Sequence, residues 1–396
     1  SSVETIISSI KIRAMLKINL PPGSLPPNAE KLRSEVRDFL AKHLSDYSSA
    51  ARAKSWAGSD PAFSELLGQQ GWIGMTWPSK YGGAERSALE RYVVLEEMLA
   101  AGAPVAAHWI ADRQSGPLLL NFGTEKQRQK ILPAICRGHS YFCIGMSEPN
   151  SGSDLASIRT KGVKTKNGWQ INGSKLWTSK AHIAHYMIAL VRTAPPNPKN
   201  RHAGLSQFII DMKRPGITIR PIRNIAGDDM FNEVFFEDLV VPNDMLVGRE
   251  GEGWSQVTAE LALERSGPER YLSSYQLLYE LVSELSINPK ERNAIGVGRL
   301  VAHLATLRQM SMAVAVILED GRSPELEAAF VKEAGVAFEQ GIPSVAHDLV
   351  GRSILLGAGN FDQVMAYVTQ AARSFSLRGG TREIVRGIIA RGLGLR

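Results

Sequence analysis

The spacing of apolar residues changes twice along this 396-residue chain, and that double change constrains its fold most. Near the start, Leu32, Val36 and Leu40 recur at helical spacing. The middle third alternates apolar and polar residues with period two, as in 217–220, and helical spacing then returns. This length exceeds what one hydrophobic core usually supports. We therefore predict an α+β fold with an N-terminal helical domain (28–140), a middle β domain (141–250) and a C-terminal helical bundle (251–396).

Local signals place several element ends. Asn28 is the expected N-cap of the first helix, and Thr124 with Gln127 has the spacing of a capping box that starts another. The pairs Asn167-Gly168 and Asn172-Gly173 are typical of tight hairpin turns, so we expect a turn at each.

Residues 1–27 are expected to form a leader. Its end, 21–27, is rich in proline, which lacks an amide donor and disfavours a helix. We expect the first residues to be vector-derived, with Met15 as the natural start. The sequence shows no secretory signal and no obvious membrane span, which favours a protein of the cytoplasm without a membrane partner. The two cysteines, Cys136 and Cys143, are too few for a disulfide framework and are expected to be reduced thiols.

Charge and motifs exclude several classes of function. The net charge of +7 comes without a long Lys/Arg run, so a mildly basic surface is favoured over a nucleic-acid footprint. The pairs Gly296-x-Gly298 and Gly357-x-Gly359 lack the third glycine of a dinucleotide fingerprint. His182 and His185 have no further ligands nearby, so we predict loop histidines and no metal site.

Two polar segments in the β domain point to a ligand. The segments 146–154 and 171–179 are rich in glycine and small hydroxyl residues, which permit close backbone approach to a flat polar ligand. Trp177 beside them offers a stacking face. Taken alone, a turn-rich β domain with one interior tryptophan explains these segments equally well.

Four ordered blocks of the sequence resemble the acyl-CoA dehydrogenase family of flavoproteins. They are the segments 71–83 (GWIGMTWPSKYGG), 146–154 (MSEPNSGSD), 172–179 (NGSKLWTS) and 381–391 (TREIVRGIIAR). The resemblance covers roughly residues 25 to 396. It implies a middle β-barrel domain, a C-terminal four-helix bundle and a noncovalent FAD held between them. It also implies a homodimer or homotetramer, an acyl-CoA substrate and an electron-transfer flavoprotein as partner.

The resemblance assigns roles to residues that match the family's motifs. Met146 and Ser147 match the contacts to the flavin ring, Trp177 the tryptophan packed against it, and Ser179 the hydroxyl residue near its reactive edge. Ser153 matches a serine that touches the acyl-CoA thioester arm. The remaining cofactor residues implied are Thr381 and Glu383 on the adenine side, and Gly357 and Gly359 at a turn that contacts FAD across a subunit interface.

The catalytic base needs its own argument, because many family members carry it in a Tyr-Glu-Gly-Thr element that reads Arg378-Gly-Gly-Thr381 here. Isovaleryl-CoA and long-chain acyl-CoA dehydrogenases place the glutamate instead in a Leu-x-Leu-Glu-Arg element, which this chain has at 261–265. Glu264 is therefore the predicted base for the α-proton, with Arg265 beside the substrate; the competing interpretation is a surface carboxylate next to an arginine. The Gly379 N–H and a flavin hydroxyl would polarise the thioester carbonyl.

Departures from the family pattern keep two alternatives open. The family's Arg-x-x-Phe-Gly stretch is not recognisable between Tyr271 and Gly298, and Ser353 stands near an expected glutamine. One alternative is a flavin-dependent oxygenase or oxidase on the same fold. The other is a non-catalytic subunit of a mixed oligomer, a branch of the family that includes enzymes for steroid side chains and other bulky acyl groups.

Overall fold

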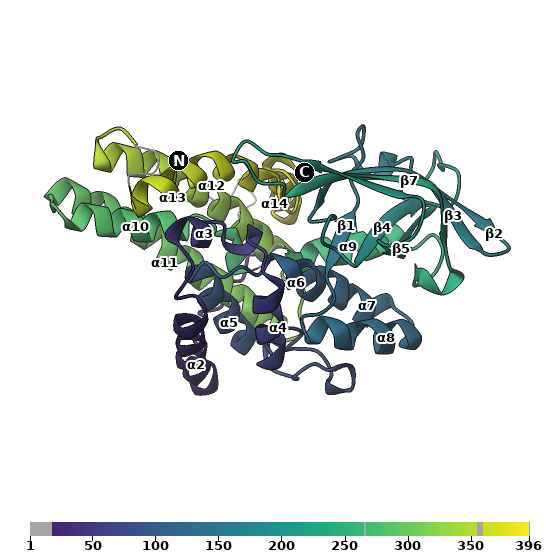
Figure 1. Ribbon diagram of the computed structural model, residues 1–396, viewed down its shortest axis with the longest axis horizontal. Coiled ribbons are helices and arrows are strands. Elements are labelled where there is room, and N and C mark those ends of the chain that lie inside the picture. Colours follow the sequence, from purple (N-terminus) through teal and green to yellow (C-terminus); the bar gives the residue numbers. More distant parts are fainter. Residues whose placement is uncertain (1–17, 265–266, 355–358, 396) are drawn as a thin grey trace, which may run out of the picture.

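The computed structural model describes residues 18–264, 267–354 and 359–395, with the backbone alone at 261–264. Helices precede and follow one sheet domain, so the predicted α+β order is confirmed (Figure 1). The helical bundle lies at one end of the molecule and the sheet at the other, with the N-terminal helices beneath both.

The N-terminal domain is built from amphipathic helices around a shared apolar core. Thr124 caps its helix through the predicted capping box, in which Thr124 Oγ1 accepts from the Gln127 N–H and Gln127 Oε1 from the Thr124 N–H. The first helix begins at Pro27 and not after Asn28, because proline suits the first helical turn, where no amide donor is needed. The helices are α2 (Pro27–His43), α3 (Ser49–Ala53), α4 (Pro61–Gln69), α5 (Ala88–Ala100), α6 (Ala106–Ile110), α7 (Gly116–Phe122) and α8 (Glu125–Cys136).

A buried histidine in this domain predicts acid sensitivity. His108 Nδ1 lies 2.8 Å from Ser64 Oγ, and burial lowers the His108 pKa from 6.5 to about 4. Between these pH values His108 binds a proton in the unfolded chain but not in the folded one. The free energy of unfolding therefore has its full value above pH 6.5 and falls by about 3 kcal/mol as the pH decreases to 4. We expect His108→Gln to lose less unfolding free energy over this interval than the wild type in urea titrations. Equal losses would contradict the assignment.

The middle domain, as described, is an eight-stranded sheet in the order β6-β7-β3-β2-β4-β5-β8, with β1 paired to β4. Strand β4 is buried on both faces: Met187 joins the core of the sheet domain, whereas Ile188 joins the core of the N-terminal helices. The strands are β1 (Phe142–Gly145), β2 (Lys161–Thr165), β3 (Gly168–Ser179), β4 (Tyr186–Arg192), β5 (Leu205–Asp211), β6 (Ile217–Ile222), β7 (Phe231–Val241) and β8 (Leu246–Val247).

Only one of the two expected hairpin turns in this region exists. The turn between β2 and β3 exists where it was predicted, but its two residues are Lys166 and Asn167, and Gly168 is the first residue of β3. The second prediction is wrong, because Asn172 and Gly173 lie inside β3 at a break in its register with β7. Gly173 has φ +142°, and a Cβ there would stand 2.7 Å from the Thr160 Cα. The glycine therefore serves a close approach of two chain segments and not a turn.

The C-terminal helices form a bundle, and α14 returns from it towards the sheet (Figure 1). Helices α10 to α13 pack on one another and build the predicted bundle. Within the bundle, the charged side chains of Lys332 and Glu339 on α12 are buried, and that of Glu333 is partly buried. The helices are α9 (Gly253–Glu264), α10 (Tyr275–Ser286), α11 (Glu291–Glu319), α12 (Glu325–Val350), α13 (Asn360–Ala371) and α14 (Arg382–Gly392).

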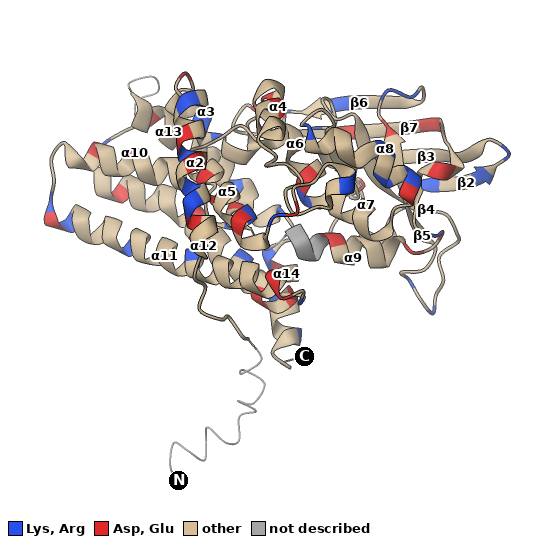
Figure 2. Ribbon diagram, turned by 90° about the horizontal axis from the view of Figure 1, so that it is seen from below, with Lys and Arg blue, Asp and Glu red and all other residues tan. Residues whose placement is uncertain are grey.

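Helix α11 is more apolar than the sequence analysis anticipated. By length and composition it could cross a membrane, and 44% of its most apolar window is buried inside the protein. Its C-terminal half packs against α5 and α12, and Arg308 pairs with Glu96 of α5 at 2.7 Å. In Figure 2, acidic and basic residues mark α2 and α5, where Arg33 also reaches Glu96. Packing between domains therefore accounts for the buried half of α11.

Candidate functional site

A bulge in β3 turns Trp177 out of the sheet. Lys175 pairs with Val234 and Thr178 with Asn232, so Leu176 and Trp177 together oppose a single residue of β7. Trp177 takes a left-handed backbone conformation, with φ +60°, and its side chain is 55% exposed. A bulge, a strained backbone and a large exposed ring are each costly or uncommon, and together they are typical of a binding surface.

The segment that follows β1 lies beside this bulge. The Leu176 N–H donates to the Ser147 carbonyl at 2.8 Å, and Lys175 Nζ donates to the Met146 carbonyl at 3.1 Å. The structure thus brings together three of the predicted flavin residues, Met146, Ser147 and Trp177. Ser179 ends the same strand opposite Phe231, whose ring meets the Trp177 indole edge-on. These residues fit a flat aromatic ring system, because the exposed indole of Trp177 lies beside the half-buried hydroxyl of Ser147.

The other predicted substrate contact in the sheet domain, Ser153, is exposed on a bend of the same segment. Its neighbour Asp154 forms an ion pair with Arg201 across the adjoining loop. Ser151 Oγ donates to the Asp154 carbonyl at 2.7 Å, which shapes the bend. Ser153 is thus available to a ligand from the solvent side.

A double-glycine turn precedes α14 and carries the predicted thioester contact. Gly379 and Gly380 have φ +63° and +96°, a pair of left-handed conformations that glycine adopts at little cost. Lys332, buried in α12, donates to the Gly380 carbonyl. Thr381 then stands at the N-cap position of α14, with Glu383 in its first turn. The Glu383 backbone N–H and the Thr381 hydroxyl hold the pKa of the Glu383 carboxyl below its usual range.

Arg378 precedes this turn, at the position of the tyrosine in the Tyr-Glu-Gly-Thr element that the sequence comparison identified. Arg378 lies 3.0 Å from Glu339, which is fully buried in α12. Its guanidinium stacks between the rings of Trp56 and Phe375, at 4.6 and 4.1 Å. The turn is therefore tied to α12 on both sides of Gly379.

A buried ion pair that the sequence analysis missed lies near the end of α9. Residues 111–115 form one turn of π-helix between α6 and α7, a distortion common at functional sites. This turn directs Arg113 to Glu269 at 2.7 Å, with both side chains buried, just after the end of α9. The adjacent Asp112 accepts from the Gly74 N–H at 2.7 Å, which ties the 71–83 block to the same turn.

Several predicted site residues fall outside the described side chains. Glu264 is the last residue of α9, and only its backbone is described. Arg265 and Gly357 lie outside the described residues altogether. Gly359 is at the N-cap position of α13, in extended backbone with φ 175°. The roles of these residues therefore stay predictions.

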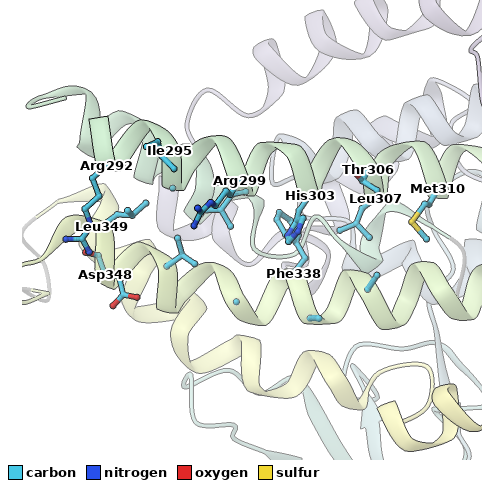
Figure 3. Close-up of a pocket in the computed structure, with 16 residues that line it drawn as sticks. Arg292, Ile295, Arg299, His303, Thr306, Leu307, Met310, Phe338, Asp348 and Leu349 are labelled. Atoms are coloured by element: carbon cyan, nitrogen blue, oxygen red, sulfur yellow. The ribbon is translucent and has the colours of Figure 1, made fainter. Parts of the chain in front are cut away.

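A well-formed groove lies away from all of these residues. A groove of about 860 Å³ runs between α11 and α12, on the bundle surface (Figure 3). Ile295, Arg299, His303, Leu307 and Met310 project into it from α11, and Phe338 faces them from α12. No predicted flavin or substrate residue lines this groove among the side chains that the structure describes.

Comparisons with known proteins agree with the fold. Residues 26–139 match the family model "Acyl-CoA dehydrogenase, N-terminal domain" and residues 143–239 match "Acyl-CoA dehydrogenase, middle domain". The acyl-CoA dehydrogenase IpdE1 of Mycobacterium tuberculosis is 32% identical over 93% of this chain and 98% of its own length. FadE34 of the same organism is also 32% identical, but this chain spans only 44% of it.

Solved structures with the same fold include two-chain assemblies. The "Tcur3481-Tcur3483 steroid ACAD" has a TM-score of 0.83 at 26% identity, covering 96% of this chain and 99% of that one. A chain of the ChsE4-ChsE5 complex from Mycobacterium tuberculosis has a TM-score of 0.79 at 28% identity, covering 94% and 99%.

Proposed function

Because this chain belongs to the acyl-CoA dehydrogenase family of oxidoreductases, we propose that it catalyses the FAD-dependent α,β-dehydrogenation of an acyl-CoA thioester to a trans-2-enoyl-CoA. The observation that carries this proposal is the exposed, bulged Trp177 beside the Met146–Ser147 segment, a platform suited to a flavin ring. Bound FAD would supply the hydride acceptor. An electron-transfer flavoprotein would then reoxidise the enzyme.

The residues of this chain would bind the thioester and move its proton. Glu264 would remove the α-proton. Its place at the end of α9, five residues before the buried Glu269 that pairs with Arg113, is compatible with that role. The Gly379 N–H would bind the thioester carbonyl, with its turn held by Lys332. Further proposed contacts are Ser153 and Arg265 to substrate, and Ser179, Gly357, Gly359, Thr381 and Glu383 to FAD.

We propose a bulky, ring-bearing acyl group as substrate. Gly379 has no side chain, so it leaves space next to the thioester. The likeness to a structure whose title names a steroid enzyme supports the same class.

The flavin absorbance tests this function. The purified protein, loaded with FAD, is mixed without oxygen with short, long, branched and ring-bearing acyl-CoAs. Bleaching of the flavin band is expected, and most rapid with a ring-bearing substrate. If FAD binds but no acyl-CoA bleaches it, dehydrogenation is wrong; if only straight chains bleach it, the substrate class is wrong.

We further propose that a second copy of this chain covers the groove between α11 and α12. The groove is rimmed by basic Arg292 and Arg299 on α11 and by acidic Asp348 on α12, so a two-fold related copy would set opposite charges together. Ile295 is 52% exposed in the single chain although it lines this groove.

Light scattering tests that assembly. The wild type is expected to have the mass of a dimer or tetramer. Ile295→Glu should reduce that mass, because it replaces an apolar side chain of the interface with a carboxylate that must lose its water on association. Val163→Glu, which changes an exposed valine of β2, is the control and should keep the wild-type mass. A wild-type monomer, or an Ile295→Glu variant of unchanged mass, would contradict the proposal.

A further inference from the structure

A buried ion pair lies directly behind the segment assigned to the flavin. Lys175 on β3 is fully buried, and its Nζ lies 2.8 Å from Glu148 Oε1. The Glu148 carboxylate also accepts backbone N–H bonds from Thr160 at 2.9 Å, through Oε1, and from Arg159 at 2.6 Å, through Oε2. Both carboxylate oxygens therefore accept hydrogen bonds, and the ion pair is held in place by the surrounding backbone.

Lys175 links the two segments of the candidate flavin site, which are residues 146–147 and the bulge of β3 at 176–177. Its Nζ donates to the Met146 carbonyl, and the next residue, Leu176, donates its N–H to the Ser147 carbonyl. The bulge that carries Trp177 begins immediately after Lys175. Lys175 and Leu176 of β3 thus bind Met146 and Ser147, directly before Trp177, whose side chain points out of the sheet.

An apolar side chain would fill this position at a lower cost. Removing an ammonium group from water is expensive, and burial lowers the Lys175 pKa to about 8 despite the nearby Glu148 carboxylate. Among the charged groups that the structure describes, Glu148 is the one that raises the Lys175 pKa. Glu148 also favours the charged form of Arg192, whose pKa burial lowers. The stem of Lys175 packs against Gly145, where an added Cβ would stand 3.2 Å from the Lys175 Cγ.

We propose that Lys175, paired with Glu148, is a positioning residue for the flavin that sets the spacing between the Met146–Ser147 segment and Trp177. This inference rests on the proposed function, because it assumes that these residues hold FAD. Lys175 acts through the backbone carbonyl of Met146 and through the start of the bulge, without touching the cofactor itself.

The dissociation constant of FAD tests the inference on the apoprotein. Lys175→Met, which removes charge-assisted bonds but keeps the length of the chain, is expected to raise the constant about ten- to a hundredfold. Glu148→Gln should raise it less, since Lys175 can still donate to Met146. Lys161→Met, at an exposed lysine on the neighbouring strand β2, is the matched control and should bind FAD like the wild type.

The pH profile separates positioning from a general loss of structure. Wild-type FAD affinity is expected to fall as pH rises through about 8, where Lys175 loses its proton, and Lys175→Met should lack that step. Thermal melts of the apoproteins show which variants fold. If Lys175→Met folds and binds FAD like the wild type, the inference is wrong; if it does not fold, a flat wild-type profile would overturn the inference instead. A wild type that binds no FAD at any pH would refute the proposed function itself.

Discussion

Glu264→Gln is expected to slow reduction of the bound flavin by acyl-CoA about 10²- to 10⁴-fold, the usual contribution of a general base. Glutamine keeps the size of the side chain but cannot accept the α-proton. FAD binding and its absorption spectrum should stay unchanged, because Glu264 is not among the proposed FAD contacts. Stopped-flow absorbance under anaerobic conditions measures the rate.

The matched control for this variant is Glu250→Gln, which changes an exposed glutamate shortly before α9. It should reduce the flavin at the wild-type rate. If Glu264→Gln also reduces at that rate, the base is another residue, and the surface interpretation of Glu264 is correct.

The second large effect is on stability. Glu339→Gln is expected to lower the free energy of unfolding by about 3–5 kcal/mol, because it removes the carboxylate partner of the largely buried Arg378. Glu339 Oε1 also accepts from the Ser273 N–H at 2.7 Å, a bond that glutamine can keep. The loss of stability therefore comes from the ion pair and the hydrogen bond to Arg378. Urea unfolding followed by circular dichroism measures it.

Two further variants check the cause of that loss. Glu333→Gln on the same helix breaks ion pairs with the more exposed Arg382 and Arg386, and should cost only about 0–1 kcal/mol. The double variant Arg378→Met with Glu339→Gln should recover part of the stability, since the guanidinium that Glu339 balances is removed together with the carboxylate. A double variant less stable than Glu339→Gln alone would contradict this explanation.

Much of the architecture was accessible from sequence because it depends on local periodicity. The helical spacing and the capping box at Thr124 are short-range signals, and both agree with the structure. The turn signal at Asn172-Gly173 failed for a long-range reason. The glycine there permits an approach to Thr160 on another part of the chain, and nothing in the local sequence distinguishes that use from a hairpin.

The candidate site could be predicted only in part. The motif blocks led to Met146, Ser147 and Trp177, which the structure brings together. Lys175 lies inside one block but was passed over, because a lysine in an alternating strand is normally assigned to solvent. Arg113 and Glu269 are 156 residues apart, so their pairing requires the folded chain. Arg113 stands in the polar run ADRQS (111–115), so nothing in the local sequence distinguishes it from an exposed residue.

The identity of the product tests the central claim most directly. The FAD-loaded protein is incubated with a ring-bearing acyl-CoA without oxygen, and the CoA ester is analysed by mass spectrometry after the flavin has bleached. Dehydrogenation predicts one product molecule per flavin, lighter than the substrate by two hydrogen atoms and carrying a trans-2 double bond. An unchanged ester, or a product that forms only in air and has gained oxygen, would contradict it.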